Sequence, residues 1–101
     1  MKKYVLKIEG CEPVEIEGWE AMNAGERKLS LCFAVASRLG VTAGLDLLVL
    51  QHMELCQNHP NLAPLADSVW PRARRDFVRK CALHGFVFGD VDRALVGSEP
   101  P

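Results

Sequence analysis

The chain has 101 residues, of which 49% are hydrophobic and 25% charged, and its formal net charge is −1. This mixture is typical of one small globular domain and excludes an intrinsically disordered chain. A net charge so close to zero also argues against a nucleic acid or an anionic membrane attracted by the charge of the whole molecule. We interpret residues 1–96 as one compact domain and residues 97–101 as a frayed tail.

The N-terminal segment does not have the pattern of a secretory signal, because Lys7 and Glu9 interrupt its first apolar run. No segment approaches the roughly 18 apolar residues that a membrane-spanning helix needs. We therefore expect a cytoplasmic protein without a membrane partner. In that compartment the cysteines are expected to be reduced thiols rather than disulfides.

Two segments, 3–9 and 14–19, alternate apolar and polar side chains. A period of two residues is typical of a half-buried strand. The residues between the segments include a glycine and a proline, which suit a tight connection. We predict an antiparallel β-hairpin. The segment 86–88 reads either as a short third strand beside this hairpin or as a packed turn.

A first helix is predicted from Asn23 to Leu39. Asn23 and Glu26 have the spacing of a capping box, in which each side chain binds the backbone of the other residue. Apolar side chains then recur three and four residues apart, as on one face of a helix. Gly40 is well placed to end the helix.

A second helix is predicted to open at Thr42 and to stop near Asn58, because Pro60 disfavours helical geometry at the residue before it. Between residues 45 and 56 this helix is apolar on two faces. We expect such a helix either at the centre of the domain or buried in a homodimer interface.

The next segment, 60–71, reads as a connector with at most one helical turn. Asp67 or Ser68 is predicted to cap a third helix that runs to about His84, with Pro71 tolerated in its first turn.

Asp90 is predicted to cap a short final helix through Leu95. The fold class is therefore α+β, with an N-terminal antiparallel hairpin packed against three main α-helices. This order of elements resembles that of phage tail-assembly chaperones, in organisation only and without diagnostic residues. The resemblance would imply a bacterial or phage-like accessory protein.

Two cysteines and two histidines are spaced so that they could meet between the second and third helices. His52 and Cys56 share a helix face, and so do Cys81 and His84. Zinc accepts such a set in tetrahedral geometry, but structural zinc sites usually begin with a close cysteine pair, which is absent here. Because free cysteines are commonly small buried hydrophobes, we keep these four residues as candidates, assign no metal and predict no cofactor.

The third helix carries a cluster of basic residues. Arg72, Arg75 and Arg79 fall on one face, and Lys80 is adjacent. This face could contact nucleic acid or an acidic protein partner. The predicted connector, with its three prolines, is longer than the turn of a helix-turn-helix, so nucleic acid is the less favoured partner.

The sequence contains no glycine-rich phosphate loop and no Gly-x-Ser-x-Gly motif, and we predict that the protein is not an enzyme. The leading hypothesis is a small, adaptor-like protein-interaction module, because a domain of this size cannot easily hide the apolar surface of residues 45–56. The first alternative is a nucleic-acid-binding or regulatory protein using the basic helix 72–80. The second is a metal-binding protein using the cysteine and histidine cluster.

Overall fold

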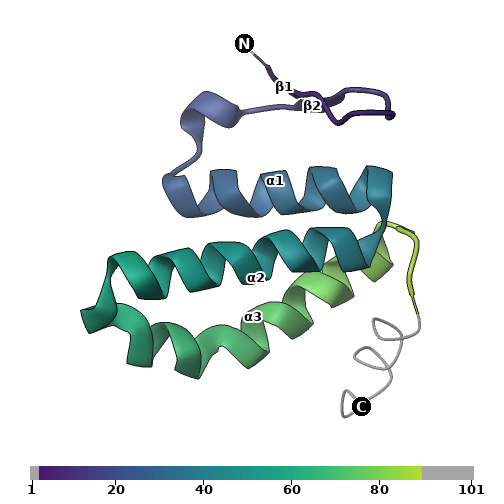
Figure 1. Cartoon of the computed structure of the whole chain (residues 1–101). Helices are drawn as coiled ribbons and strands as arrows, with labels where there is room; N and C mark the ends of the chain where they lie inside the picture. The colour runs from purple at the N-terminus through teal and green to yellow at the C-terminus, as the bar shows by residue number, and fades with distance from the viewer. Residues whose placement is uncertain (1–2, 90–101) are drawn as a thin grey trace.

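A computed structural model of the chain describes residues 3–89 (Figure 1). The elements, in chain order, are β1 (Tyr4–Leu6), β2 (Val14–Ile16), the 3₁₀ turn η1 (Trp19–Ala21), α1 (Ala24–Leu39), α2 (Val41–Asn58), the 3₁₀ turn η2 (Pro60–Leu62) and α3 (Ala63–Leu83). The predicted α+β class, a hairpin followed by three helices, is confirmed. The predicted final helix at 90–95 and the tail 97–101 lie outside the described residues. Within the described range, no helix has the length and apolarity needed to cross a membrane.

The two strands pair in antiparallel fashion, with Tyr4 opposite Ile16 and Leu6 opposite Val14. Ile16 is the buried residue of the two strands. Its burial fixes the register of the strand pair, because a shift by one residue would turn Ile16 to the opposite face. The Tyr4 ring stacks on Trp19, with ring centroids 4.2 Å apart. The hairpin is thus short and rests on few side chains.

Helix α1 begins with the predicted capping box. The Asn23 Oδ1 accepts a hydrogen bond from the Glu26 N–H at 2.8 Å, and the Glu26 Oε1 accepts one from the Asn23 N–H at 3.0 Å. At the other end Gly40 has a φ of 99°, a conformation that favours glycine. This glycine turns the chain so sharply that α2 starts at Val41, one residue before the predicted start.

Helix α2 lies between α1 and α3 (Figure 1), as expected for the first of the two alternatives, but its residues 45–56 are only half-buried or exposed. The buried core is formed by Cys32, Ala36, Val41, Phe77, Val78 and Cys81. Helices α1 and α2 are in close contact at Gly44, where a Cβ atom would lie 2.7 Å from both the Ala36 Cβ and the Cys32 carbonyl oxygen. The absence of a side chain at this position therefore sets the distance between the two helices.

The hairpin lies on the side of α1 that faces away from α2 (Figure 1). Two arginines of α1 hold the hairpin and the 3₁₀ turn η1 that follows it. The Arg27 Nε donates to the Trp19 carbonyl at 3.0 Å, and its guanidinium lies over the Trp19 ring. The Arg38 Nε donates to the Glu12 carbonyl at 3.0 Å, and its Nη2 donates to the Pro13 carbonyl at 3.3 Å. Because these arginines belong to opposite halves of α1, the hairpin is attached at two separated points.

The start of α3 differs from the prediction. The helix begins at Ala63, so most of the segment 60–71 is helical and not a connector. Pro64 falls in the first turn, where the backbone N–H has no helical partner to lose. Pro71 lies inside the helix, and the helix bends along its length in Figure 1. A bend is expected because a proline removes one backbone hydrogen bond of the helix. Asp67 is consequently a helix residue and not a cap.

The segment 86–88 is not a strand, so the first of the two predicted alternatives, a third strand beside the hairpin, is wrong. Instead, the Val87 carbonyl accepts a hydrogen bond from the Val41 N–H at 2.9 Å, and Phe86 and Phe88 pack against the core. The chain leaving α3 emerges beside the start of α2, and the first N–H groups of a helix lack partners within the helix. This segment therefore pairs with α2 and not with the hairpin.

Candidate metal centre and apolar groove

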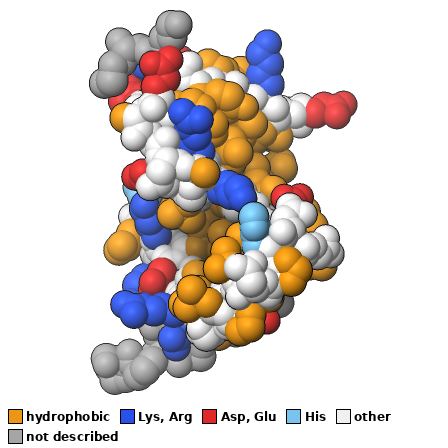
Figure 2. All heavy atoms as spheres, turned by 90° about the vertical axis from the view of Figure 1, so that its left-hand side faces the viewer, with side chains coloured by type: hydrophobic (Ala, Val, Ile, Leu, Met, Phe, Trp, Pro, Cys, Tyr) orange, Lys and Arg blue, Asp and Glu red, His pale blue; other side chains and the backbone are white. Residues whose placement is uncertain are grey.

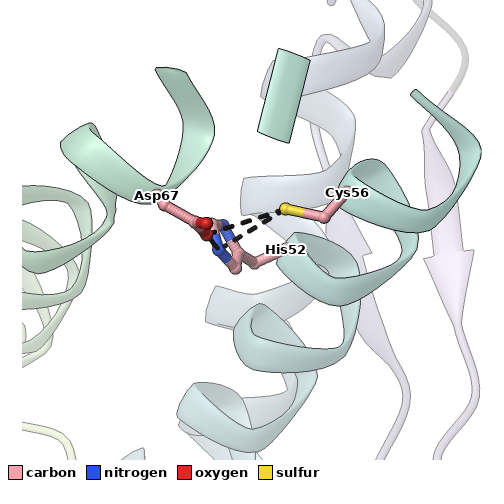
Figure 3. A group of neighbouring side chains, drawn as sticks. All are labelled: His52, Cys56 and Asp67. Atoms are coloured by element: carbon pink, nitrogen blue, oxygen red, sulfur yellow. Dashed lines mark hydrogen bonds and ion pairs between the residues drawn. The ribbon is translucent and has the colours of Figure 1, made fainter. Parts of the chain in front are cut away.

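Three metal-ligating side chains converge where the beginning of α3 passes the end of α2 (Figure 3). His52 and Cys56 are one turn apart on α2, and Asp67 projects toward them from α3. The His52 Nε2 lies 2.8 Å from the Asp67 Oδ1. The Cys56 Sγ lies 3.8 Å from the His52 Nε2 and 3.8 Å from the Asp67 Oδ1. One nitrogen, one sulfur and one oxygen therefore surround a common point.

This arrangement is not that of a catalytic relay. In a relay, one ring nitrogen of the histidine faces the nucleophile and the other binds the carboxylate. Here the same atom, His52 Nε2, is the neighbour of both Cys56 and Asp67. Partial desolvation and the adjacent Asp67 carboxylate also raise the pKa of the Cys56 thiol, whereas a reactive thiol needs a lowered pKa. The geometry and the charge both favour ligation over nucleophilic catalysis.

The His52 ring is held from one side by Trp70 of α3, with ring centroids 4.7 Å apart. The His52 side chain is 18% exposed, whereas the Asp67 side chain is 67% exposed. The centre is thus fixed on its histidine side and open to solvent on its carboxylate side.

The structure divides the four residues predicted from the sequence. His52 and Cys56 lie together, but Cys81 is four helical turns further along α3 than Asp67, roughly 20 Å away. Cys81 is buried in the core. The His84 ring stacks with Phe86 at 5.6 Å between centroids. The His52–Cys56 pair of α2 therefore lies beside the beginning of α3, whereas Cys81 and His84 lie at the end of α3.

Asp67 is the residue that the sequence reasoning missed, because it was assigned as a helix cap. The available signal was the spacing of Ala66, Trp70 and Phe77, which continues one helical stripe across Pro71. A helix extended through this proline places Asp67 beside that stripe, toward α2.

A second feature is an apolar groove between α1 and α3, with α2 as its floor. It consists of two adjoining hollows of about 310 and 270 Å³ that share Leu29 of α1, Leu48 of α2 and Ala73 of α3. The larger hollow reaches Trp70 and His52, and thus borders the metal-ligating cluster. Figure 2, which views the molecule from the α2–α3 turn, shows hydrophobic side chains among basic ones on this end.

The groove has charged rims. Lys28 of α1 lines the larger hollow, and Lys80 and Asp76 of α3 line the smaller one. The Lys80 Nζ lies 4.6 Å from the centroid of the Phe33 ring on α1, so this lysine reaches across the narrow end. Asp76 is paired with Arg72 at 3.8 Å.

On α3 the apolar surface continues beyond the hollows. Val69 is one turn before Ala73 on the same side of the helix, and Leu65 is one turn before Val69. Their exposed fractions are 52% and 63%, respectively. The groove therefore opens onto an exposed apolar stripe toward the α2–α3 turn.

The predicted basic face is exposed. Arg72, Arg75 and Arg79 lie on the side of α3 away from the buried Phe77. Lys80 instead points toward α1 and belongs to the rim of the groove. The structure thus separates the predicted basic residues into a solvent-facing arginine row and a groove lysine.

No protein-family model matches this chain, and no curated protein and no solved structure is significantly similar to it. Its function must therefore be argued from its own side chains.

Proposed function

We propose that this protein is a non-enzymatic interaction module that binds one amphipathic helix of a protein partner in the groove between α1 and α3. The observation that carries the proposal is the apolar groove itself, which joins Leu29, Leu48 and Ala73 from three different helices. Grooves of this kind between helices are a recurrent way to bind the apolar face of a partner helix.

The length of the groove supports a helical occupant. Along α3 it extends from Trp70 to Lys80, which is about 15 Å or roughly three helical turns. A partner helix of that length presents apolar side chains at positions i, i+3 or i+4, and i+7. The exposed Val69 extends the contact by one more turn.

The charges on the rims indicate the partner's polar residues. Lys28 and Lys80 stand on opposite walls of the groove, whereas Asp76 already pairs with Arg72. A partner helix with acidic residues beside its apolar stripe would complement both lysines. We therefore infer an acidic amphipathic helix as the occupant.

The test is selection of helical peptides from a display library on the full-length protein, followed by affinity measurements on variants. Ala73 is an exposed helix residue at the centre of the groove, so Ala73→Arg should fold and block it. We expect the selection to yield acidic amphipathic peptides. Their affinity for the Ala73→Arg variant should be more than about tenfold lower than for wild type, equivalent to about 1.4 kcal/mol. Lys28→Glu should weaken binding less, through the lost charge.

The matched control is Arg75→Glu, on the opposite side of α3, which should leave peptide affinity unchanged. Selected peptides that bind wild type and Ala73→Arg equally would contradict the proposal. So would a homodimer that light scattering detects for wild type and not for Ala73→Arg, because a second copy would then fill the groove.

A homodimer through residues 45–56 would use a different surface. In this segment every residue is half-buried or exposed, and its exposed large apolar residues are Leu50 and Met53. If this pair forms an interface, Leu50→Glu should convert a dimer to a monomer in light scattering.

A second candidate function is nucleic-acid binding through the arginine row of α3, and the exposure of Arg72, Arg75 and Arg79 favours it. The short link between α2 and α3 removes the objection based on a long connector. Binding to duplex DNA should weaken steeply with salt, and Arg75→Glu should weaken it further. An affinity that hardly changes between low and moderate salt would exclude this candidate.

A further inference from the structure

We propose that His52, Cys56 and Asp67 form a binding site for one zinc-class divalent cation, with a fourth coordination position left for water or an external ligand. The site goes beyond the proposed groove function and rests on three donor atoms, of which only that of His52 belongs to a residue that also lines the groove. Its ligands come from two helices, so a bound ion would join the end of α2 to the beginning of α3.

Two of the three separations between the donor atoms are close to those of a tetrahedral site, and the third is too short. With the usual zinc bond lengths, two ligand atoms of a tetrahedral site lie roughly 3.3–3.6 Å apart. The observed separations are 2.8, 3.8 and 3.8 Å. The largest adjustment concerns His52 and Asp67, which form a direct hydrogen bond where an ion would separate them. A rotation of the exposed Asp67 side chain could provide this space.

The chemistry of the donors selects the metal. A thiolate and an imidazole suit zinc, cobalt and related ions, whereas magnesium and calcium prefer sets of oxygen atoms. The charge of a divalent ion would be neutralised by the Cys56 thiolate and the Asp67 carboxylate. Such a neutral centre is less costly at a half-buried position than a net charge.

Packing against a neighbouring side chain orients the His52 ring. Trp70 packs against the ring, while the neighbouring Asp67 is exposed. The ring is therefore held in place, and an ion can enter from the solvent side.

Binding follows a simple proton balance. The Cys56 thiol loses its proton to the buffer and its sulfur bonds to the metal. Neutral His52 ligates through the Nε2 lone pair, so the Nε2 proton of the His52–Asp67 hydrogen bond is lost to solvent while Nδ1 takes up a proton. An ordinary cysteine thiol is protonated at neutral pH, so protons compete with the metal for the Cys56 sulfur. We expect affinity to increase roughly tenfold between pH 7 and 8, with about one proton released per ion.

The experiment is titration of the full-length protein with cobalt(II) alone, followed by displacement with zinc(II). We expect one cobalt per chain, a thiolate-to-cobalt charge-transfer band in the near ultraviolet, and loss of that band when zinc is added. Cys56→Ser should abolish the band and lower zinc affinity by more than about 100-fold, since even the loss of an outer-shell partner typically costs 10- to 100-fold.

Asp67→Asn should retain the band and lower affinity at least about tenfold. Two matched controls, Cys11→Ser and His84→Gln, replace the same residue types elsewhere and should leave affinity unchanged. Circular dichroism establishes that each variant is folded. A wild-type protein without a stoichiometric cobalt band overturns the proposal, as does a band that persists in folded Cys56→Ser or an affinity unaffected by Asp67→Asn.

Discussion

Helix α1 carries two very different contacts on its two sides. On the inner side, Cys32 and Ala36 allow α2 to approach until Gly44 touches them. On the outer side, the hairpin is held by hydrogen bonds from Arg27 and Arg38 to backbone carbonyls. One helix can therefore pack closely against an apolar neighbour on one side and bind a second element by polar contacts on the other. Only the apolar packing contributes to the cooperative core. The hairpin is expected to open locally at a lower free energy than the helices.

The largest effect is expected at the inner contact. Gly44→Ala places a Cβ 2.7 Å from the Ala36 Cβ and the Cys32 carbonyl, and the helix backbone cannot move aside without cost. We expect the free energy of unfolding to decrease by about 1–3 kcal/mol, despite the better helix propensity of alanine. Urea denaturation measures this change.

Gly25→Ala is the matched control, because Gly25 also lies in a helix but has only Asn23 Oδ1 nearby, at 3.4 Å. Here the helix propensity gain should dominate and raise stability by up to about 1 kcal/mol. Equal effects of Gly44→Ala and Gly25→Ala would show that the α1–α2 contact is not close-packed.

The next effect concerns pH. Burial raises the pKa of the Cys32 thiol from 9.0 to about 11. The unfolded chain therefore loses this proton at lower pH than the folded protein does, so the contribution of Cys32 is complete below pH 9 and is lost as pH rises toward 11. By pH 10 the loss should be about 1 kcal/mol relative to neutral pH.

The measurement is denaturant stability of wild type and Cys32→Ala across this pH range. Lysines and tyrosine also titrate there, so the difference between the two proteins isolates Cys32. If wild type and Cys32→Ala lose the same free energy of unfolding between pH 8 and 10, the buried Cys32 thiol does not cause the loss.

A smaller and more local effect is expected at the outer contact. Arg38→Ala removes two hydrogen bonds to the hairpin, each with a net contribution of about 0.5–1.5 kcal/mol, and the exposure of Arg38 places them near the lower value. Hydrogen exchange of the β1 and β2 amides should accelerate several-fold, while that of α2 stays constant. Acceleration of α2 to the same extent would mean that the hairpin and the helices open together.

The smallest effect is expected within the hairpin itself. Lys3 binds Glu15 at 3.2 Å and Glu17 at 3.6 Å, and these carboxylates raise the pKa of Lys3. All three side chains are well exposed, so solvent screens the pairs. We expect no measurable change in Tm for Lys3→Ala, whereas a clear decrease would show that surface charges help hold the hairpin.

Most of the fold was predictable because its signals are local. The alternating residues of the hairpin, the capping box at Asn23 and the helix end before Pro60 all depend on near neighbours in the chain. The start of α3 was not, because the proline-rich segment 60–71 reads as a connector and Pro71 is then expected in the first turn of the helix. Tertiary packing of the stripe across Pro71 outweighs the single hydrogen bond that this proline removes.

The site was half predictable for the same reason. His52 and Cys56 are neighbours within one helix, so their spacing alone places them together. Asp67 and Trp70 reach them only because α3 folds back along α2, which depends on where α3 begins. Antiparallel pairing of the two helices alone suggests that Cys81 joins His52 and Cys56. The sequence does not show that Cys81 and the metal-ligating cluster lie at opposite ends of α3.

The close contact at Gly44 also has an evolutionary consequence. A larger side chain at this position or at Ala36 would push α1 from α2 and shift the α1 wall of the groove. Homologous sequences should therefore retain small residues at both positions, or exchange them together, even where exposed positions have diverged. This pattern, combined with the capping box at Asn23, is a more specific criterion for recognising distant relatives than overall sequence identity.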